Sequence, residues 1–116
     1  MKTTKLTNQS KIVFSEVDIL LKQLVTRIKD GPGKATTDLR RSAFNNSGLK
    51  EPLKSFIDKV ANTAYTITDN DVSLVKSAIS EDEIFELVIC ASVGQSTRQF
   101  ENALKALNEV DNNINS

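Results

Sequence analysis

The stretch that decides the fold runs Ser80-Glu81-Asp82-Glu83-Ile84-Phe85-Glu86-Leu87-Val88-Ile89-Cys90-Ala91-Ser92-Val93-Gly94. Its first four residues form an S-x-x-E capping box, in which side chains satisfy backbone N–H groups at the start of a helix. Residues 84–94 are apolar on nearly every side, so a helix here needs partners all round. The β-branched residues make a strand the rival interpretation. The capping box, and the helical spacing that follows at Phe100, Ala103, Leu104 and Leu107, favour a helix.

An amphipathic helix is predicted near the start of the chain. The apolar residues that recur at helical spacing are Val17, Leu20, Leu21, Leu24, Val25 and Ile28. Ser15 is the expected N-cap, and Asp30-Gly31-Pro32-Gly33 is the expected stop, since glycine permits a left-handed cap and proline cannot continue the ladder.

Three shorter helices are predicted between these two. The first runs from about Asp38 to Phe44, opened by Thr37 and closed by the polar stretch 45–48. The second begins near Pro52 and has its core positions at Leu53, Phe56, Ile57, Val60, Ala61 and Ala64. The third is capped by Thr68 with Asp71 three residues on.

Together these elements predict one all-α domain of five or six helices over residues 11–109. Residues 1–10 are expected to form a flexible N-terminus and residues 110–116 a frayed tail. The short amphipathic helices do not cover every face of the apolar helix, so we expect a homo-oligomer that assembles through Ile84 to Gly94. A single central helix covered within one subunit is the alternative.

Composition excludes several kinds of site. The 116 residues include 15 Lys+Arg, 15 Asp+Glu, no His and one Cys. The absence of histidine excludes imidazole bases and His-ligated metals, and one cysteine excludes an internal disulfide. We therefore expect no metal and no cofactor. Charge neutrality argues against nucleic acid. With no apolar run of membrane length and no signal-peptide pattern, we expect no membrane partner and a cytoplasmic location.

Four minor motifs have structural explanations. Gly31-Pro32-Gly33-Lys34 lacks the glycine spacing of a phosphate-binding loop and is interpreted as a helix stop. Arg40-Arg41 with Lys34 is interpreted as a solvated basic face. Cys90 is expected to be an inert core thiol. The acidic run, which comprises Glu81, Asp82, Glu83 and Glu86, is explained by capping and the helix dipole.

A hydroxyl-rich stretch, residues 63–70, is the most informative polar feature. In order along the chain stand a core-spaced helix, this polar turn, a short helix, and the Ser80 capping box that opens a long apolar helix. This order resembles the alkylhydroperoxidase-D-like superfamily, which includes the carboxymuconolactone decarboxylases, over roughly residues 50–107. The stretches Asp30-Gly31-Pro32-Gly33 and Arg40-Arg41-Ser42-Ala43-Phe44 look like the front end of a compact branch.

The resemblance assigns positions to the family's redox site. Redox-active members end the helix before the turn in C-A-Y-C-x-x-x-H, and this chain has Thr63-Ala64-Tyr65-Thr66-Ile67-Thr68-Asp69-Asn70. Thr63 and Thr66 stand at the cysteine positions and Asn70 at the histidine position. The family's supporting glutamate falls on Glu51. Peroxide reduction needs a thiolate, a second thiol and a base, and this turn supplies none of them.

The resemblance therefore implies a superfamily member without thiol peroxidase activity, with its specific function open. Thr63, Tyr65, Thr66 and Asn70 are expected to bind a small molecule, with Glu51 nearby. One alternative is a cofactor-independent decarboxylase or isomerase of a small lactone or keto acid, using Glu51, Tyr65 or Asp69 as acid or base. Another is a structural homo-oligomeric interaction module without a small-molecule site.

Overall fold

The computed structural model describes residues 8–115, with side chains described for residues 15–112. This part of the chain forms five α-helices, one 3-10 helix and no strand: α1 (Asn8–Asp30), α2 (Thr37–Asn45), α3 (Leu53–Asn62), η1 (Ala64–Thr66), α4 (Asp69–Lys76) and α5 (Glu81–Asn115). The all-α prediction is confirmed, and residues 84–94 are helical rather than extended.

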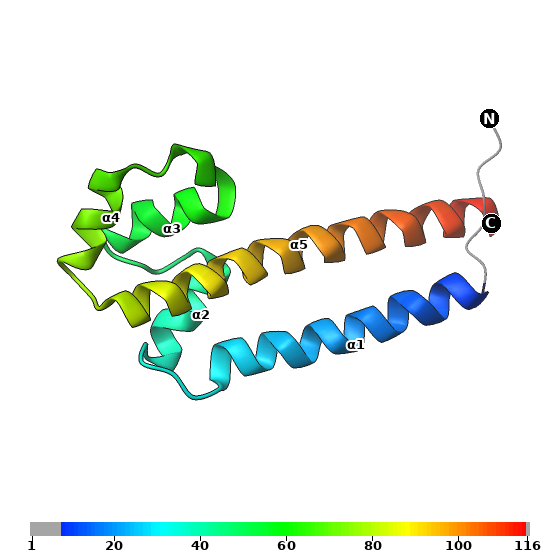
Figure 1. The fold of residues 1–116 in the computed structure, drawn as a ribbon. Helices are drawn as coiled ribbons and strands as arrows, with labels where there is room; N and C mark the ends of the chain where they lie inside the picture. The colour runs from blue at the N-terminus through cyan, green and yellow to red at the C-terminus, as the bar shows by residue number, and fades with distance from the viewer. Residues whose placement is uncertain (1–7, 116) are drawn as a thin grey trace.

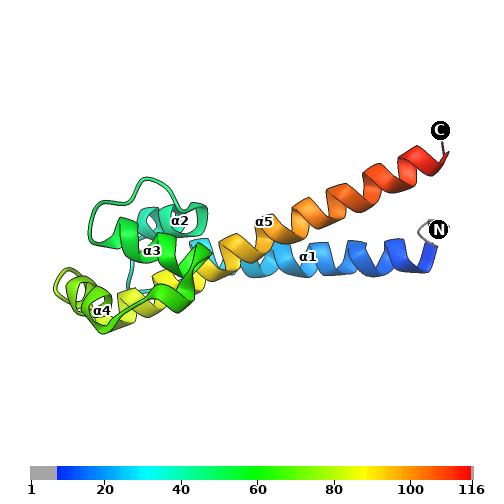
Figure 2. The same cartoon turned by 90° about the horizontal axis from the view of Figure 1, so that it is seen from above.

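The helices form a compact head and a long arm. In both views, α2, α3 and α4 gather around the first half of α5, whereas α1 and the second half of α5 extend away from them in the same direction and diverge toward their far ends in Figure 2 (Figures 1 and 2). The molecule is accordingly elongated, with extents of 55 × 31 × 20 Å.

The core of the head forms where α5 meets the three short helices. Leu87, Cys90 and Ala91 of α5 are buried there. They pack with a set contributed by α2, α3 and α4, namely Ala43, Phe44, Phe56, Ile57 and Val75. The apolar helix thus finds much of its cover within one chain. Phe85 is the exception, since 68% of it is exposed.

A very close helix contact joins the end of α2 to α5 at Gly94. A Cβ atom added to Gly94 would overlap the carbonyl oxygen of Phe44 and lie 2.8 Å from its carbonyl carbon. The same carbonyl oxygen accepts a hydrogen bond of 2.7 Å from Nη1 of Arg98. Only glycine permits this approach, so the backbone of α2 rests directly on α5.

The capping predictions are confirmed at two helices and shifted by one residue at a third. Thr68 and Asp71 form a reciprocal capping box at α4. At α5, the Ser80 hydroxyl accepts from the Glu83 N–H at 3.2 Å, and the Glu83 carboxylate accepts from the Ser80 N–H at 3.1 Å. At α2 the cap is Thr36 rather than Thr37.

The two long helices extend beyond their predicted limits. α1 begins at Asn8, so Ser15 lies inside the helix and is not its N-cap. Of the N-terminus expected to be flexible, residues 8–10 belong to α1, and residues 1–7 lie outside the described part. α5 continues to Asn115 through the stretch for which we expected a frayed tail. Neither extension contains glycine or proline, so nothing in the backbone stops the helix.

Candidate functional site

Thr63 and Thr66, which the resemblance assigns to the cysteine positions, contact each other. Thr63 follows the last residue of α3, and Thr66 ends η1. The Thr66 hydroxyl donates to the Thr63 carbonyl oxygen at 2.7 Å, and its Oγ1 lies 3.2 Å from Oγ1 of Thr63. The turn therefore brings the side-chain atoms of residues 63 and 66 within direct contact.

A salt bridge between α3 and α4 holds the two sides of this turn together. Nζ of Lys59 lies 2.8 Å from Oδ2 of Asp71, which also accepts from the Thr68 N–H at 2.9 Å. The hydrogen bond from Lys59, followed by the bond from the Thr68 backbone, lowers the pKa of Asp71 below its ordinary value of 3.8. The turn is thus fixed at both ends by a carboxylate that stays ionised.

The other predicted binding residues lie on the open surface of the turn. Tyr65 is 88% exposed. Thr66, Asp69 and Asn70 are also exposed, and Thr63 is half-buried. Four pockets and grooves over residues 18–112 are all lined by other residues. A molecule bound here would therefore lie against the surface of the turn.

The structure does not bring Glu51 to this turn. Glu51 precedes α3, whereas Thr63 follows it, so the length of the helix separates them by about 15 Å at 1.5 Å per residue. The carboxylate of Glu51 accepts from the Ser55 hydroxyl at 2.8 Å and is exposed. The expectation that Glu51 lies near the threonines is not met, because the ten residues of α3 stand between them and place them at opposite ends of the helix.

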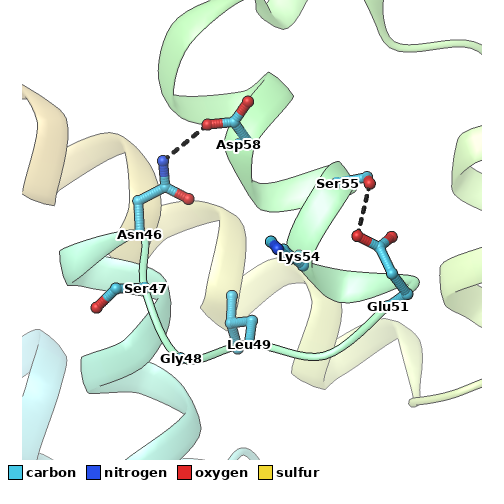
Figure 3. Close-up of a pocket in the computed structure, with 8 residues that line it drawn as sticks. All are labelled: Asn46, Ser47, Gly48, Leu49, Glu51, Lys54, Ser55 and Asp58. Atoms are coloured by element: carbon cyan, nitrogen blue, oxygen red, sulfur yellow. Dashed lines mark hydrogen bonds between the residues drawn. The ribbon is translucent and has the colours of Figure 1, made fainter.

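Glu51 instead lines a pocket between the end of α2 and the start of α3 (Figure 3). Its volume is about 200 Å³, and Nδ2 of Asn46 donates to Oδ1 of Asp58 at 3.0 Å across it. Its lining residues are Asn46, Ser47, Gly48, Leu49, Glu51, Lys54, Ser55 and Asp58. Sequence reasoning missed this pocket because its two sides are separate elements with no common motif.

The loop after α1 holds an anion, but that anion is a side chain of the same molecule. The backbone N–H groups of Lys34 and Ala35 donate to the two carboxylate oxygens of Glu86 at 2.7 and 2.6 Å. Burial tends to raise the pKa of Glu86. The bonds from Ala35 and Lys34, with the positive charges of Arg40 and Lys34, outweigh it and lower the pKa below 4.5. Glu86 is therefore a structural anion rather than only a first-turn charge.

Arg40 is buried, which corrects its assignment to a solvated face. It is 6% exposed, and Nη1 donates to the Ile28 carbonyl oxygen at 3.1 Å. Its Nε has no hydrogen-bond partner among the described residues. Arg41 and Lys34 are exposed as predicted, and Arg41 lies 2.6 Å from the Asp30 carboxylate. The two arginines point to different sides of α2 because neighbours on a helix are about 100° apart.

The only cysteine is unsuited to redox chemistry. Cys90 is 1% exposed, and its Sγ lies 3.8 Å from the Ile28 carbonyl oxygen. Burial raises the pKa of the thiol above 9.0, and the nearby charge of Arg40 offsets only part of this effect. Cys90 therefore stays protonated at neutral pH, as the sequence predicts.

Comparison of the chain with protein-family models, with curated proteins and with solved structures found no match. Across the described residues, no three Cys, Asp or Glu side chains are grouped so that they could hold a metal ion. Within the same part of the chain, no helix has the length and apolar character that crossing a membrane requires.

Proposed function

We propose that this protein is a member of the alkylhydroperoxidase-D-like superfamily that has lost thiol peroxidase chemistry and binds a small molecule at the turn of residues 63–70. Thr63, Tyr65, Thr66 and Asn70 form its binding surface. Two hydroxyls, a phenol and an amide supply hydrogen-bond donors and acceptors without a charge, which suits a small polar uncharged group on the ligand.

The observation that carries this proposal is the 3.2 Å contact between Oγ1 of Thr63 and Oγ1 of Thr66. A C-x-x-C pair works only if its two sulfur atoms can come into bonding contact, with Cβ atoms about 4 Å apart. Regular helical geometry places residues three apart at about 5 to 6 Å between Cβ atoms. The 3.2 Å contact supports the correspondence with the cysteine positions, because the side chains at these two positions reach each other across the irregular turn after α3.

The same residues explain the proposed loss of activity. In a dithiol peroxidase, a thiolate attacks the peroxide to give a sulfenic acid and water. The second thiol then displaces a second water to form the disulfide. The threonine hydroxyls are far less acidic than thiols and form no disulfide. Buried Cys90, with its raised pKa, supplies neither the nucleophile nor a partner.

The first prediction restores the thiols. We expect the double variant Thr63→Cys with Thr66→Cys to form an intramolecular disulfide when treated with hydrogen peroxide. Two of its three thiols disappear, and the chain loses two hydrogen atoms in mass. Thiol titration and mass spectrometry of the intact protein follow the reaction.

The matched control is Ser73→Cys with Lys76→Cys, which places two exposed thiols at the same spacing inside the regular helix α4. We expect this pair to oxidise to the internal disulfide at least about tenfold more slowly, because helical Cβ separation strains the bond. Equal rates for the two pairs would overturn the correspondence. So would dithiol-dependent peroxide turnover by the natural chain that survives Cys90→Ser.

Self-association and location complete the proposal. We propose a homo-oligomer, for which the 68% exposure of Phe85 in the apolar stretch Ile84 to Gly94 is the supporting observation. We also propose a cytoplasmic location, which a single unpaired thiol suits.

One observation favours a second candidate, a cofactor-independent decarboxylase or isomerase of a small lactone or keto acid. Glu51 lines a pocket of about 200 Å³ together with Lys54 and Asp58, so a carboxylate and an ammonium group border one space. Tyr65 and Asp69 lie at the other end of α3 and are not part of it. Turnover of a lactone or keto acid that Glu51→Gln abolishes, and that Thr63→Val with Thr66→Val leaves intact, would favour this candidate.

A further inference from the structure

The arm carries one apolar, uncharged face that the described part of the chain leaves uncovered. We name it the arm face and define it by Val17, Leu20 and Leu24 of α1 and Ala103, Leu107 and Val110 of α5. The exposed fractions are 64% for Leu20, 44% for Leu24 and 41% for Val17. Leu107 and Val110 are 37% and 42% exposed. Together these side chains present on the order of several hundred Å² of apolar surface, the size at which exposed patches mark interaction sites.

On α1 the arm face is the uncovered half of a single apolar stripe. Leu21, Val25 and Ile28 are the partly buried half, and Val25 and Ile28 pack against the core. At about 100° per residue, Val17, Leu20 and Leu24 continue the same stripe around the helix. One neighbouring helix covers only about half of so wide a stripe, so α1 needs a second neighbour.

Helical phase places the two halves of the arm face on the same side of the arm. Lys22 of α1 and Glu101 of α5 line one groove between the helices. The α1 members of the arm face lie about 160° to 220° around the helix from Lys22. The α5 members lie about 180° to 240° around from Glu101. Both sets therefore lie opposite the groove.

Charged side chains of the arm border the groove, on the side opposite the arm face. The groove between α1 and α5 is bordered by Asp18, Lys22, Lys29 and Glu101, and Lys22 pairs with Asp18 at 2.9 Å. The arm face contains no ionisable side chain. Depletion of charge at the centre of a patch is one feature that distinguishes interface cores from ordinary surface.

We propose that the arm face binds the arm face of a second copy of this chain, so that two two-helix arms form a four-helix bundle around a two-fold axis. A bundle of this kind buries its apolar stripes between antiparallel neighbours. A two-fold interface uses the same patch on both copies, and an uncharged patch meets its own copy without repulsion. This inference rests on the self-association proposed above and places the main interface on the arm rather than at Ile84 to Gly94.

The charge pattern favours a second copy over a membrane surface. A helix that lies on anionic lipid combines an apolar face with a polar face rich in Lys and Arg. The polar side of this arm mixes both signs, since Asp18 and Glu101 stand among its lysines. An arm of this length, about 35 Å along α1, matches the helices of four-helix bundles.

The test is sedimentation of the full chain at tens of micromolar. We expect the natural chain to sediment as a dimer, or as a larger assembly built from dimers. Leu20→Glu should raise the dissociation constant of the dimer at least about 100-fold, because each copy would then bury a charge against apolar side chains. Leu20 is exposed in the single chain, so circular dichroism should show unchanged helix content.

Ile19→Glu is the matched control. Ile19 neighbours Leu20, is 55% exposed and has the same chemistry, but lies about 100° further round, outside the arm face. We expect Ile19→Glu to leave the assembly intact. Loss of assembly in Ile19→Glu and Leu20→Glu alike would overturn the proposal.

Phe85→Glu separates this inference from the oligomer proposed above. An assembly that Phe85→Glu abolishes and Leu20→Glu leaves intact overturns the arm interface and retains self-association through Ile84 to Gly94. A natural chain that stays monomeric at 100 micromolar overturns both proposals, as does a monomer that sediments with vesicles of phosphatidylcholine and phosphatidylserine. None of these outcomes bears on the proposed binding surface at residues 63–70.

Discussion

The carboxylate of Glu86 shows how one side chain determines the path of a distant loop. It accepts backbone hydrogen bonds of 2.7 and 2.6 Å from Lys34 and Ala35, more than fifty residues earlier in the chain. A Cβ atom on Gly33 would lie 2.9 Å from the same carboxylate, so the loop is fitted closely around it. Glu86 thereby fixes the connection between α1 and α2 on the surface of α5.

We predict that Glu86→Gln destabilises the protein by about 1–2 kcal/mol at pH 7. A neutral amide has one acceptor oxygen, so one of the two N–H groups would face an NH₂ group. Urea denaturation measures the change in the free energy of unfolding. Glu81→Gln is the control, since the Glu81 side chain is 78% exposed and should change stability by less than about 0.5 kcal/mol.

The same contact has a defined pH dependence. The pKa of Glu86 is lower in the folded chain than its ordinary value of 4.5, so the unfolded chain binds more protons as the pH falls. The stabilisation from this contact is complete above about pH 4.5, the ordinary pKa of the group. It is lost as the pH falls through the lower pKa that Glu86 has in the folded chain. The difference in stability between the natural chain and Glu86→Gln should therefore shrink at acidic pH. A difference that grows there would contradict this assignment.

At the scale of elements, the contact between α2 and α5 depends on Gly94. We predict that Gly94→Ala destabilises the protein by about 1–3 kcal/mol, although alanine is the better helix former by about 1 kcal/mol. The added methyl group would overlap the Phe44 carbonyl oxygen, which also binds Arg98, so the backbones must move apart. Thermal unfolding measures the effect.

Asn102→Ala serves as the control for this substitution, because Asn102 is an exposed position of the same helix. There alanine should raise the melting temperature slightly through helix propensity alone. If Gly94→Ala also raised the melting temperature, the close approach of α2 to α5 would not be a feature of the folded protein.

The elements that sequence predicted well are those set by local chemistry. The boxes at Thr68 and Ser80 stand where expected, because a cap depends on residues three apart. Helix ends without a breaker were missed: α1 begins at Asn8 and α5 runs to Asn115, since no glycine or proline marks a limit in either stretch.

Features that depend on tertiary packing could not be predicted from the amino-acid sequence. Arg40 is buried because the end of α1 supplies a carbonyl oxygen to it, and no pattern in α2 indicates this. Glu51 lies apart from Thr63 because α3 spans the distance between them. The contact between Thr63 and Thr66 depends on the irregular turn after α3, where Thr63 has left the helix, and local spacing alone did not predict this conformation.

At the scale of the whole molecule, the buried thiol reports on opening of the head. Cys90 lies in the core between α5 and the short helices, so a reagent reaches it only when this packing opens. We predict that iodoacetamide labels Cys90 at least about 1,000-fold more slowly in the folded chain than in urea. Mass spectrometry of the intact protein follows the labelling.

The variant Ser73→Cys provides an internal comparison, because it adds a second, exposed thiol on α4. That thiol should be alkylated at the rate of the unfolded chain while Cys90 in the same molecule stays protected. Equal labelling of both positions would contradict a buried Cys90, and with it the argument that this chain has no accessible thiol.

The exposure of Tyr65 has a practical consequence. The chain contains no tryptophan and a single tyrosine, and that tyrosine stands 88% exposed on the turn of residues 63–70. The near-ultraviolet absorption and the fluorescence of the whole protein therefore arise almost entirely from this one residue at the candidate site. A ligand that stacks on the ring would quench or shift this emission, whereas assembly through the distant arm would leave it unchanged. The protein thus carries an intrinsic optical probe at this turn, and no label has to be introduced to observe binding there.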